Sequence, residues 1–158
     1  MTQEQLPQPA LVVLVGVSGS GKSTWAAGHF APNEVVSSDQ LRAVVGHGEH
    51  DQLASADAFA VLDQILGARS RRRLSTVVDS TGLDRKRRQR YLAVARAAAL
   101  PALVVILDTD GDTCRSRNAA RDRRVPSIVL TAQLVQLALA LGQIEAEGWD
   151  AVVRVRQQ

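Results

Sequence analysis

The chain has 158 residues, of which 46% are hydrophobic and 22% are charged, and its net charge is +3. This composition is typical of one soluble globular domain with a full core. The single cysteine, Cys114, excludes an internal disulfide and indicates a reducing compartment. The polar N-terminus lacks the layout of a signal peptide, and no apolar run is expected to reach the length of a membrane span. We therefore expect a cytoplasmic protein with no membrane partner.

Short aliphatic runs alternate with segments of helical periodicity along the chain. Strands are expected at residues 11–15, 34–37, 75–79, 102–107 and 151–155. Helices are expected at residues 23–29, 39–45, 51–70, 83–99, 113–121 and 127–147. A short flexible lead at 1–9 precedes a single domain at 10–158. The alternation predicts an α/β fold, a central parallel sheet of about five strands with helices on both faces.

The stretch after the first predicted strand reads Gly-Val-Ser-Gly-Ser-Gly-Lys-Ser-Thr and fits the P-loop pattern. Its glycines let the backbone curl and turn several N–H groups toward one anion. Lys22 can reach the outer phosphates, and the Ser23 hydroxyl can ligate Mg²⁺. A Gly/Ser-rich linker explains neither the preceding strand nor the Lys-Ser pair. We predict a nucleotide site made of Gly16, Ser18, Gly19, Ser20, Gly21, Lys22, Ser23 and Thr24.

Polar residues follow the second predicted strand at the sheet edge where ligands bind in α/β folds. Asp39 and Arg42 are three residues apart at the start of a helix, so both side chains project from one face. Asp39 is the predicted general base for an acceptor hydroxyl, and Arg42 is the predicted clamp for an anionic acceptor. The alternative is a helix cap by Asp39 beside a solvent-facing Arg42.

A second set of polar residues follows the third predicted strand. Asp79 occupies the position where P-loop proteins often keep a carboxylate near Mg²⁺, and structural hydrogen bonding is the alternative. Thr81 is predicted to bond to an acceptor phosphate or to Asp79. Arg88 lies on an inward-facing helical row, and we predict that it lies at the acceptor rim of the site.

Two arginines, Arg117 and Arg121, lie four residues apart on the fifth predicted helix. Arginines on a mobile lid over a P-loop neutralise the charge on the transferring phosphoryl group and exclude water. We therefore predict that this helix is a lid over the donor phosphates. The alternative is a basic helix end that interacts with the negative end of the helix dipole.

The basic charge is concentrated between Arg69 and Arg96, where ten Lys or Arg residues accompany only two acids. The segment therefore has a charge of +8, ten minus two. Such a block suits a polyanionic partner. A solvated helix face in an arginine-rich protein is the alternative, and charge alone does not separate the two interpretations.

Together these motifs resemble the 5′-hydroxyl polynucleotide kinases, above all the kinase module of bacterial RNA end-healing polynucleotide kinase–phosphatases. The P-loop is generic, whereas Ser-Asp-x-x-Arg at 38–42 and Arg-Asn-x-x-Arg at 117–121 are far more specific together. The other matching pieces are residues 11–16, 35–37, 41, 49, 51–52, 58–59, 61–62, 76–79, 81 and 114.

The resemblance implies that the γ-phosphate of an NTP, either ATP or GTP, is transferred to the 5′-OH of RNA or DNA with Mg²⁺. It implies that Lys22 and Ser23 bind phosphate and metal, and that Asp39 is the general base. Arg42 would hold the phosphate next to the acceptor 5′ end, while the two lid arginines would contact the donor phosphates.

The chain departs from the family pattern at Gly82, which stands where the family has Asn. The change removes an amide that would order the substrate loop. The family's bacterial members continue into phosphatase and ligase modules, so the resemblance implies an isolated module or a stand-alone kinase that works with such partners. The sequence leaves the oligomeric state and the donor base open.

Two other functional classes remain compatible with parts of the pattern. A P-loop kinase for a small hydroxylated metabolite or antibiotic would use the same P-loop, Asp39 and lid, but it has no use for the basic segment. A nucleotide-dependent switch needs neither an acceptor base nor a charge-neutralising lid. The leading hypothesis from sequence is therefore a polynucleotide 5′-hydroxyl kinase.

Overall fold

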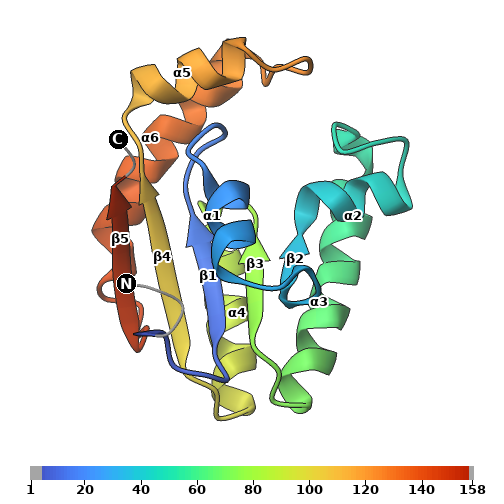
Figure 1. Cartoon of the computed structure of the whole chain (residues 1–158), viewed down its shortest axis with the longest axis vertical. Helices are drawn as coiled ribbons and strands as arrows, with labels where there is room; N and C mark the ends of the chain where they lie inside the picture. Colours follow the sequence, from blue (N-terminus) through green and yellow to red (C-terminus); the bar gives the residue numbers. More distant parts are fainter. Residues whose placement is uncertain (1–4, 157–158) are drawn as a thin grey trace.

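A computed structural model describes residues 5–156 and contains one five-stranded sheet in the order β2-β3-β1-β4-β5 (Figure 1). All four strand pairs are parallel, as the alternation of strands and helices predicts. The predicted fold class is therefore confirmed. The strands are β1 (Leu11–Val15), β2 (Val35–Ser37), β3 (Thr76–Asp79), β4 (Ala102–Asp108) and β5 (Ala151–Arg156).

The central strand β1 is buried along its whole length, and it pairs with β3 on one side and β4 on the other. Val13 lies opposite Val78 in β3 and Val104 in β4. A strand covered on both faces has no solvent side, so its sequence is continuously aliphatic rather than alternating. The P-loop therefore leaves the sheet at its centre, between the ends of the two neighbouring strands.

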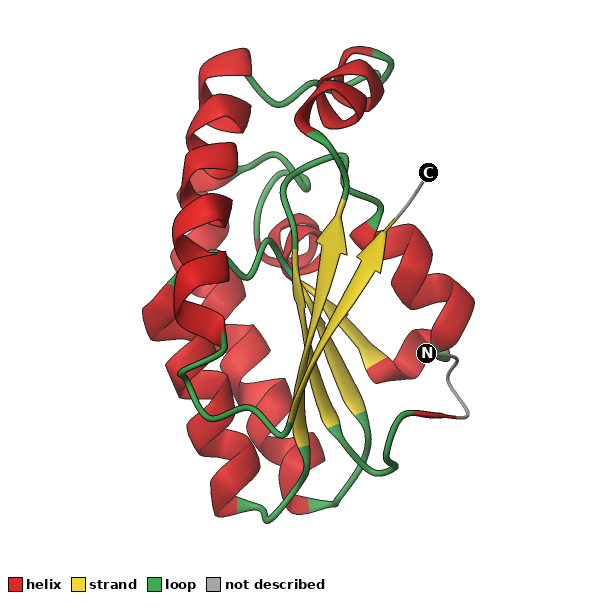
Figure 2. Cartoon of the chain, turned by 90° about the vertical axis from the view of Figure 1, so that its left-hand side faces the viewer, coloured by secondary structure: helices red, strands yellow, loops and turns green. Residues whose placement is uncertain are grey.

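Helices cover both faces of the sheet, with α1 on one face and α3, α4 and α6 on the other (Figure 2). Every helix differs from its predicted bounds by at least one residue, and two differ by three residues or more. The third begins at Ser55 because Asp51 caps a separate 3-10 turn, and the last ends at Ile144. The helices are α1 (Lys22–His29), α2 (Ser38–Val45), α3 (Ser55–Arg71), α4 (Arg85–Ala97), α5 (Gly111–Ala119) and α6 (Ser127–Ile144), with 3-10 turns η2 (Pro32–Glu34) and η3 (Gln52–Ala54).

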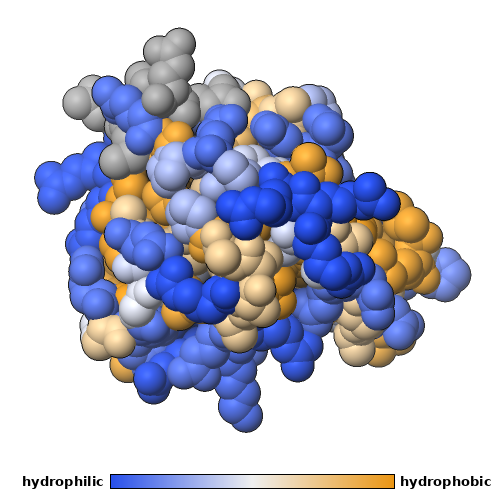
Figure 3. Space-filling view, turned by 90° about the horizontal axis from the view of Figure 1, so that it is seen from below, coloured by the Kyte–Doolittle hydropathy of each residue, from blue (hydrophilic) through white to orange (hydrophobic). Residues whose placement is uncertain are grey.

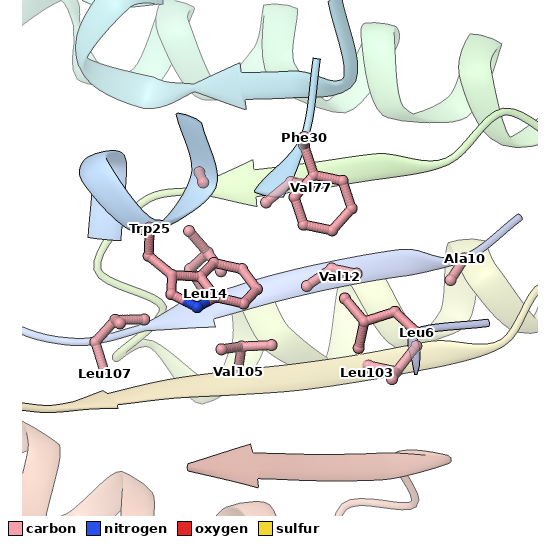
Figure 4. Packing of buried hydrophobic residues seen from close by; sticks show 11 residues of the cluster. Leu6, Ala10, Val12, Leu14, Trp25, Phe30, Val77, Leu103, Val105 and Leu107 are labelled. Carbon is pink, nitrogen blue, oxygen red and sulfur yellow. The ribbon is translucent and has the colours of Figure 1, made fainter. Parts of the chain in front are cut away.

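The core under α1 is built on the aliphatic face of β1 (Figure 4). Trp25 is 7% exposed and belongs to the same cluster as Leu14 and Phe30, so its prediction as a core residue is confirmed. Leu6 is buried in this cluster as well. Residues 1–4 of the predicted flexible lead lie outside the described residues, but Leu6 anchors the lead to the domain, while Pro7 and Gln8 are exposed.

Helix α6 corrects the expectation that no apolar run reaches the length of a membrane span. Among the described residues it is the one helix that is long and apolar enough to cross a membrane by length and composition. In the fold it packs on the sheet through Leu130, Leu137, Ala140 and Ile144, in one cluster with Val104 and Ile106 of β4. Its apolar character is therefore partly explained by core packing.

Candidate active site

The P-loop joins β1 to α1 and leaves the first N–H groups of α1 without a side-chain cap. Gly21, the N-cap residue, has φ 96°, and Gly19 has φ 82°. A Cβ at Gly19 would lie 2.8 Å from the carbonyl oxygen of Cys114, so the loop packs tightly against α5. Free N–H groups at the positive end of a helix bind anions, which fits the predicted phosphate site.

Lys22 lies at the base of this loop and donates a 3.0 Å hydrogen bond to the carbonyl oxygen of Val17. Burial lowers the pKa of Lys22 to about 8, although Asp79 and Asp39 oppose the shift. Arg121 lowers this pKa further. The predicted phosphate-binding lysine, metal carboxylate, general base and lid arginine therefore all lie within electrostatic reach of one another.

Ser23 and Asp79 form the predicted metal pair, because the Ser23 hydroxyl donates a 2.8 Å hydrogen bond to Asp79 Oδ2. Burial raises the pKa of Asp79, and the bond from Ser23 only partly offsets this effect. Both groups offer the hard oxygen ligands that Mg²⁺ prefers, and Mg²⁺ takes its other ligands from water and substrate phosphates. No cluster of three or more His, Cys, Asp or Glu residues suited to a metal occurs between residues 5 and 156. The residues present thus fit a magnesium ion that is held together with a nucleotide.

A cavity of about 200 Å³ lies over the P-loop, between it and the region of α5. Arg117 donates a 3.2 Å hydrogen bond to the carbonyl oxygen of Gly19, and Arg121 also lines the cavity. The remaining lining residues are Gly19, Gly21 and Thr24. The structure therefore brings the two predicted lid arginines to the nucleotide side of the site.

The predicted acceptor pair, Asp39 and Arg42, lies in the first turns of α2, where Ser37 is the N-cap residue instead of Asp39. Arg42 forms an ion pair with Asp39 and also donates to the Ser55 hydroxyl and the Glu49 carbonyl oxygen. The Arg42 side chain is only 13% exposed, whereas that of Asp39 is 64% exposed. Arg42 is thus anchored from three segments, and Asp39 remains open to an incoming molecule.

A contact that the sequence analysis did not find connects the lid to the acceptor side. Arg123, in the turn after α5, contacts the His50 ring in the loop between α2 and η3. The two residues are 73 positions apart, so no local spacing signals the contact. It joins the segment after α5 to the loop after α2.

The Gly82 departure from the family pattern has a steric explanation. Gly82 has φ 64°, and a Cβ there would lie 2.3 Å from the carbonyl oxygen of Leu14. Next to it, the carbonyl oxygen of Thr81 accepts a 3.0 Å hydrogen bond from Gly16 N–H. This segment is therefore pressed against β1 and the start of the P-loop, which leaves no room for a larger residue at position 82.

Arg88 corrects one prediction, because it does not lie at an acceptor rim. Its side chain is 0% exposed and pairs with Glu147, which is 2% exposed, at 2.7 Å. The guanidinium also donates to the Gly82 carbonyl oxygen and to Gln143 Oε1. The inward direction was predicted correctly, but the guanidinium joins α4 to Gly82, to Gln143 near the end of α6 and to Glu147 just after it.

The basic segment from Arg69 to Arg96 is also largely committed to internal contacts. Arg87, for example, forms a bidentate pair with Asp63, while Arg96 binds Asp150. Six of its ten basic side chains have such contacts, namely Arg69, Arg73, Arg87, Arg88, Arg90 and Arg96. The positive charge of this segment therefore serves mainly internal contacts, which weakens the interpretation of the segment as a continuous surface that binds nucleic acid.

A larger cavity of about 550 Å³ lies at the opposite end of the molecule, between the ends of α3 and α4. Figure 3 shows this end, where strongly hydrophilic side chains are mixed with apolar ones. The cavity is lined by Gly67, Ser70, Arg71, Arg73, Val94, Ala97 and Ala98. It has no carboxylate and lies at the wrong end of the strands for an α/β active site, so we place the site at the P-loop.

Comparison with solved structures identifies several proteins of this fold. A sugar kinase from Janibacter sp. HTCC2649 is 23% identical with a TM-score of 0.59, and the match covers 95% of this chain and 86% of that protein. A chain of the Pnkp1/Rnl/Hen1 RNA repair complex is 18% identical with a TM-score of 0.72, over 90% of this chain but only 49% of its own length. The Mycobacterium tuberculosis APS kinase CysC is 17% identical with a TM-score of 0.54, over 97% of this chain and 91% of that one.

Comparison with curated proteins found no match. Among protein families, residues 11–140 match AAA_33, which is described as an AAA domain. The match includes the P-loop, the Asp39–Arg42 pair, Asp79 and both lid arginines. The chain therefore belongs to the AAA_33 family and has the fold of P-loop kinases.

Proposed function

We propose that the protein is an NTP-dependent phosphotransferase that uses ATP or GTP with Mg²⁺ to phosphorylate a hydroxyl group. The observation that carries this proposal is the open carboxylate of Asp39 beside an anchored Arg42, on the acceptor side of a P-loop. Hydrolysis or nucleotide sensing requires no such pair. A kinase requires a carboxylate that orients the hydroxyl and accepts its proton.

In this mechanism the donor phosphates lie on the N-terminal end of α1, with Lys22 beside them. Ser23 and Asp79 would hold Mg²⁺, which neutralises charge on the phosphate oxygens. Arg117 and Arg121 close the nucleotide cavity and stabilise the charge on the transferring group. Asp39 accepts the proton of the attacking hydroxyl, so the γ-phosphate moves to the acceptor and NDP leaves.

The acceptor we favour is the 5′-OH end of RNA or DNA. Arg42 is a nearly buried cation whose anionic partner is Asp39, and a phosphate next to the acceptor hydroxyl would give it a second anion; Arg–phosphate pairs are strong and directional. The sequence resemblance to polynucleotide kinases and the fold similarity to the Pnkp1 RNA repair complex support the same choice. The proposal includes cytoplasmic action together with separate or fused phosphatase and ligase modules.

The direct test is transfer of labelled γ-phosphate to a 5′-OH oligonucleotide, with a 5′-phosphate oligonucleotide as the control acceptor. We expect labelling of the first only. Asp39→Asn should lower transfer by about 10²-fold or more while NTP binding stays near wild type. The exposed Asp57→Asn is the matched control and should leave transfer unchanged. No labelling of any acceptor would contradict kinase activity, and unchanged transfer by Asp39→Asn would contradict its role.

A comparison of a nucleoside 3′-phosphate with the same nucleoside isolates the contribution of Arg42. The 3′-phosphorylated acceptor should be preferred, and Arg42→Gln should remove most of that preference. Charge-assisted hydrogen bonds of this kind contribute about 1.5–3 kcal/mol, which corresponds to roughly 10- to 150-fold. The exposed Arg72→Gln should change nothing. Equal use of both acceptors would contradict a phosphate-binding role for Arg42.

The second candidate function is phosphorylation of a small hydroxylated metabolite or antibiotic. The internal pairing of the basic segment favours it, because a small acceptor needs no long cationic track. The same assay with sugars and other small alcohols separates the two functions. Transfer to a small alcohol, but not to 5′-OH ends, would establish the metabolite kinase and exclude the polynucleotide kinase.

A further inference from the structure

Helix α6 presents an exposed apolar face that the proposed reaction does not use. One side of the helix is buried against the sheet, while Ile128, Val135 and Leu139 on the other side are 79%, 60% and 63% exposed. None of the 18 residues of α6 is charged. Exposed apolar side chains gathered along one helix, as opposed to scattered singly, indicate an interaction surface.

Five of the ten exposed residues of α6 follow the spacing of a helix–helix seam. They lie at positions 128, 132, 135, 139 and 142, in steps of four and three. This is the heptad spacing that keeps one stripe of side chains facing a partner helix. Helix α6 forms the edge of the helical layer (Figure 2), and the residues at 128, 132, 135, 139 and 142 are exposed.

The sizes of these side chains make the stripe complementary to itself. In an antiparallel pair of α6 helices centred on Val135, Val135 faces its own copy, Ile128 lies opposite Gly142, and Leu139 lies within one residue of the position opposite Ala132. Ile128 and Leu139 thus each meet a small side chain. A Cβ at Gly142 would have no heavy atom within 4 Å in its own chain, so there is room for a side chain of the partner.

We propose that α6 is the interface of a symmetric dimer formed with a second copy of this chain. A two-fold interface places a surface against itself, so any net charge on that surface would repel its own copy. The residues of α6 carry no charge, although the chain has 17 Arg residues and a net charge of +3, and Arg115 of α5 contacts the exposed side of the helix only beside the stripe, at Thr131. A helix that lies on a membrane surface usually carries Lys or Arg on its polar face, and a nucleic-acid interface requires cations. The stripe at positions 128, 132, 135, 139 and 142 contains neither.

The size of the face sets the expected strength of the dimer. A helix of 18 residues is about 27 Å long and about 10 Å wide. This strip is smaller than the roughly 800 Å² per partner of a standard stable interface. We therefore expect a reversible dimer with a Kd of about 10–100 µM, rather than a permanent one.

The test is sedimentation velocity of the intact chain from about 2 to about 500 µM, where mass action should convert monomer to dimer. Leu139→Glu should weaken self-association at least tenfold. Leu53→Glu is the matched control, because Leu53 is 97% exposed on η3 and lies outside the α6 face. Sedimentation as a monomer throughout, or equal loss in both variants, would overturn the proposal.

Disulfide trapping tests the geometry independently of affinity. Val135→Cys should cross-link to its own copy under oxidising conditions, whereas Ile128→Cys should not, because only position 135 lies on the two-fold axis. The native Cys114 is 0% exposed and does not compete. Cross-linking through position 128 would overturn the antiparallel arrangement. Flotation with neutral lipid vesicles that depends on Leu139, in a protein that stays monomeric, would assign the face to a membrane instead.

Discussion

Replacing Arg88 by Met is the sharpest test of the structure, because the inward arginine can be either an acceptor ligand or a structural cation. The substitution removes the guanidinium and keeps most of the apolar stem. It leaves Glu147 buried, with only the indole N–H of Trp149 still donating to it at 2.9 Å. Burial opposes ionisation of Glu147, but the bonds from Arg88 and Trp149 outweigh it and hold its pKa below the ordinary value.

The expected loss of stability follows from this burial. The two side chains of the pair are 0% and 2% exposed, and Arg88 also satisfies Gly82 and Gln143. Removing one partner of such a pair costs about 3–5 kcal/mol. With a urea m-value of about 2 kcal/mol/M, the unfolding midpoint should fall by about 1.5–2.5 M. The difference in unfolding midpoint between the variant and wild type should become smaller as the pH falls through the pKa of Glu147. Once Glu147 is protonated, the variant no longer has an unpaired buried charge.

Urea unfolding followed by circular dichroism measures this midpoint, and phosphoryl transfer under native conditions is the second measurement. The double variant Arg88→Met/Glu147→Leu should recover much of the lost stability, since it removes both charges. A midpoint within about 0.5 M of wild type, combined with a large loss of transfer, would refute the structural role and restore Arg88 to the acceptor site.

Three other predictions follow from the site. NTP affinity should fall as the pH rises above about 8, because phosphates favour the charged form of Lys22 and the free protein loses that proton near its pKa of about 8. Titration with a fluorescent nucleotide from pH 7 to 9 measures this affinity. A Lys22→Arg variant that binds should show an affinity that does not change over this pH range. Asp79→Asn should weaken the apparent Mg²⁺ affinity in transfer assays by roughly 10- to 100-fold, while Asp84→Asn, at the cap of α4, should not. Gly82→Asn should destabilise the fold by about 2 kcal/mol rather than improve acceptor binding, because its Cβ would meet the Leu14 carbonyl oxygen; a thermal midpoint equal to that of wild type would disprove the clash.

The sequence was sufficient for the parts of the fold that depend on local pattern. Aliphatic runs such as Leu11–Val15 have one stable location in a parallel sheet, between two layers of helices. The P-loop and the polar residues after β2 and β3 follow from the same logic, because parallel strands end at one edge. Asp39, Asp79 and Lys22 therefore came together as the alternation of elements predicts.

Long-range pairing is what the sequence alone did not reveal. Arg88 meets Glu147 across 59 positions, and Arg123 meets His50 across 73. An arginine on an apolar helical row does require a buried acid, so the row of Arg88 signalled that a partner exists. It did not identify which acid, since that depends on where α6 ends on the sheet. The charge of the basic segment was overestimated for the same reason. Its net charge counts Arg87 and Arg96, but their partners Asp63 and Asp150 lie outside the segment.

Pairing also bears on which acceptor the site can use. Asp39 is held by Arg42, and that arginine is itself anchored by Ser55 and the Glu49 carbonyl oxygen. A neutral alcohol has no anion that could replace Asp39 as the partner of Arg42. Arg42 and the acceptor hydroxyl would therefore compete for the Asp39 carboxylate. An acceptor that carries a phosphate beside its hydroxyl gives Arg42 a second anion and leaves Asp39 free to take the proton. Under the proposed function, a nucleic-acid 5′ end is therefore favoured by the electrostatics of two residues, and no extended basic track is required.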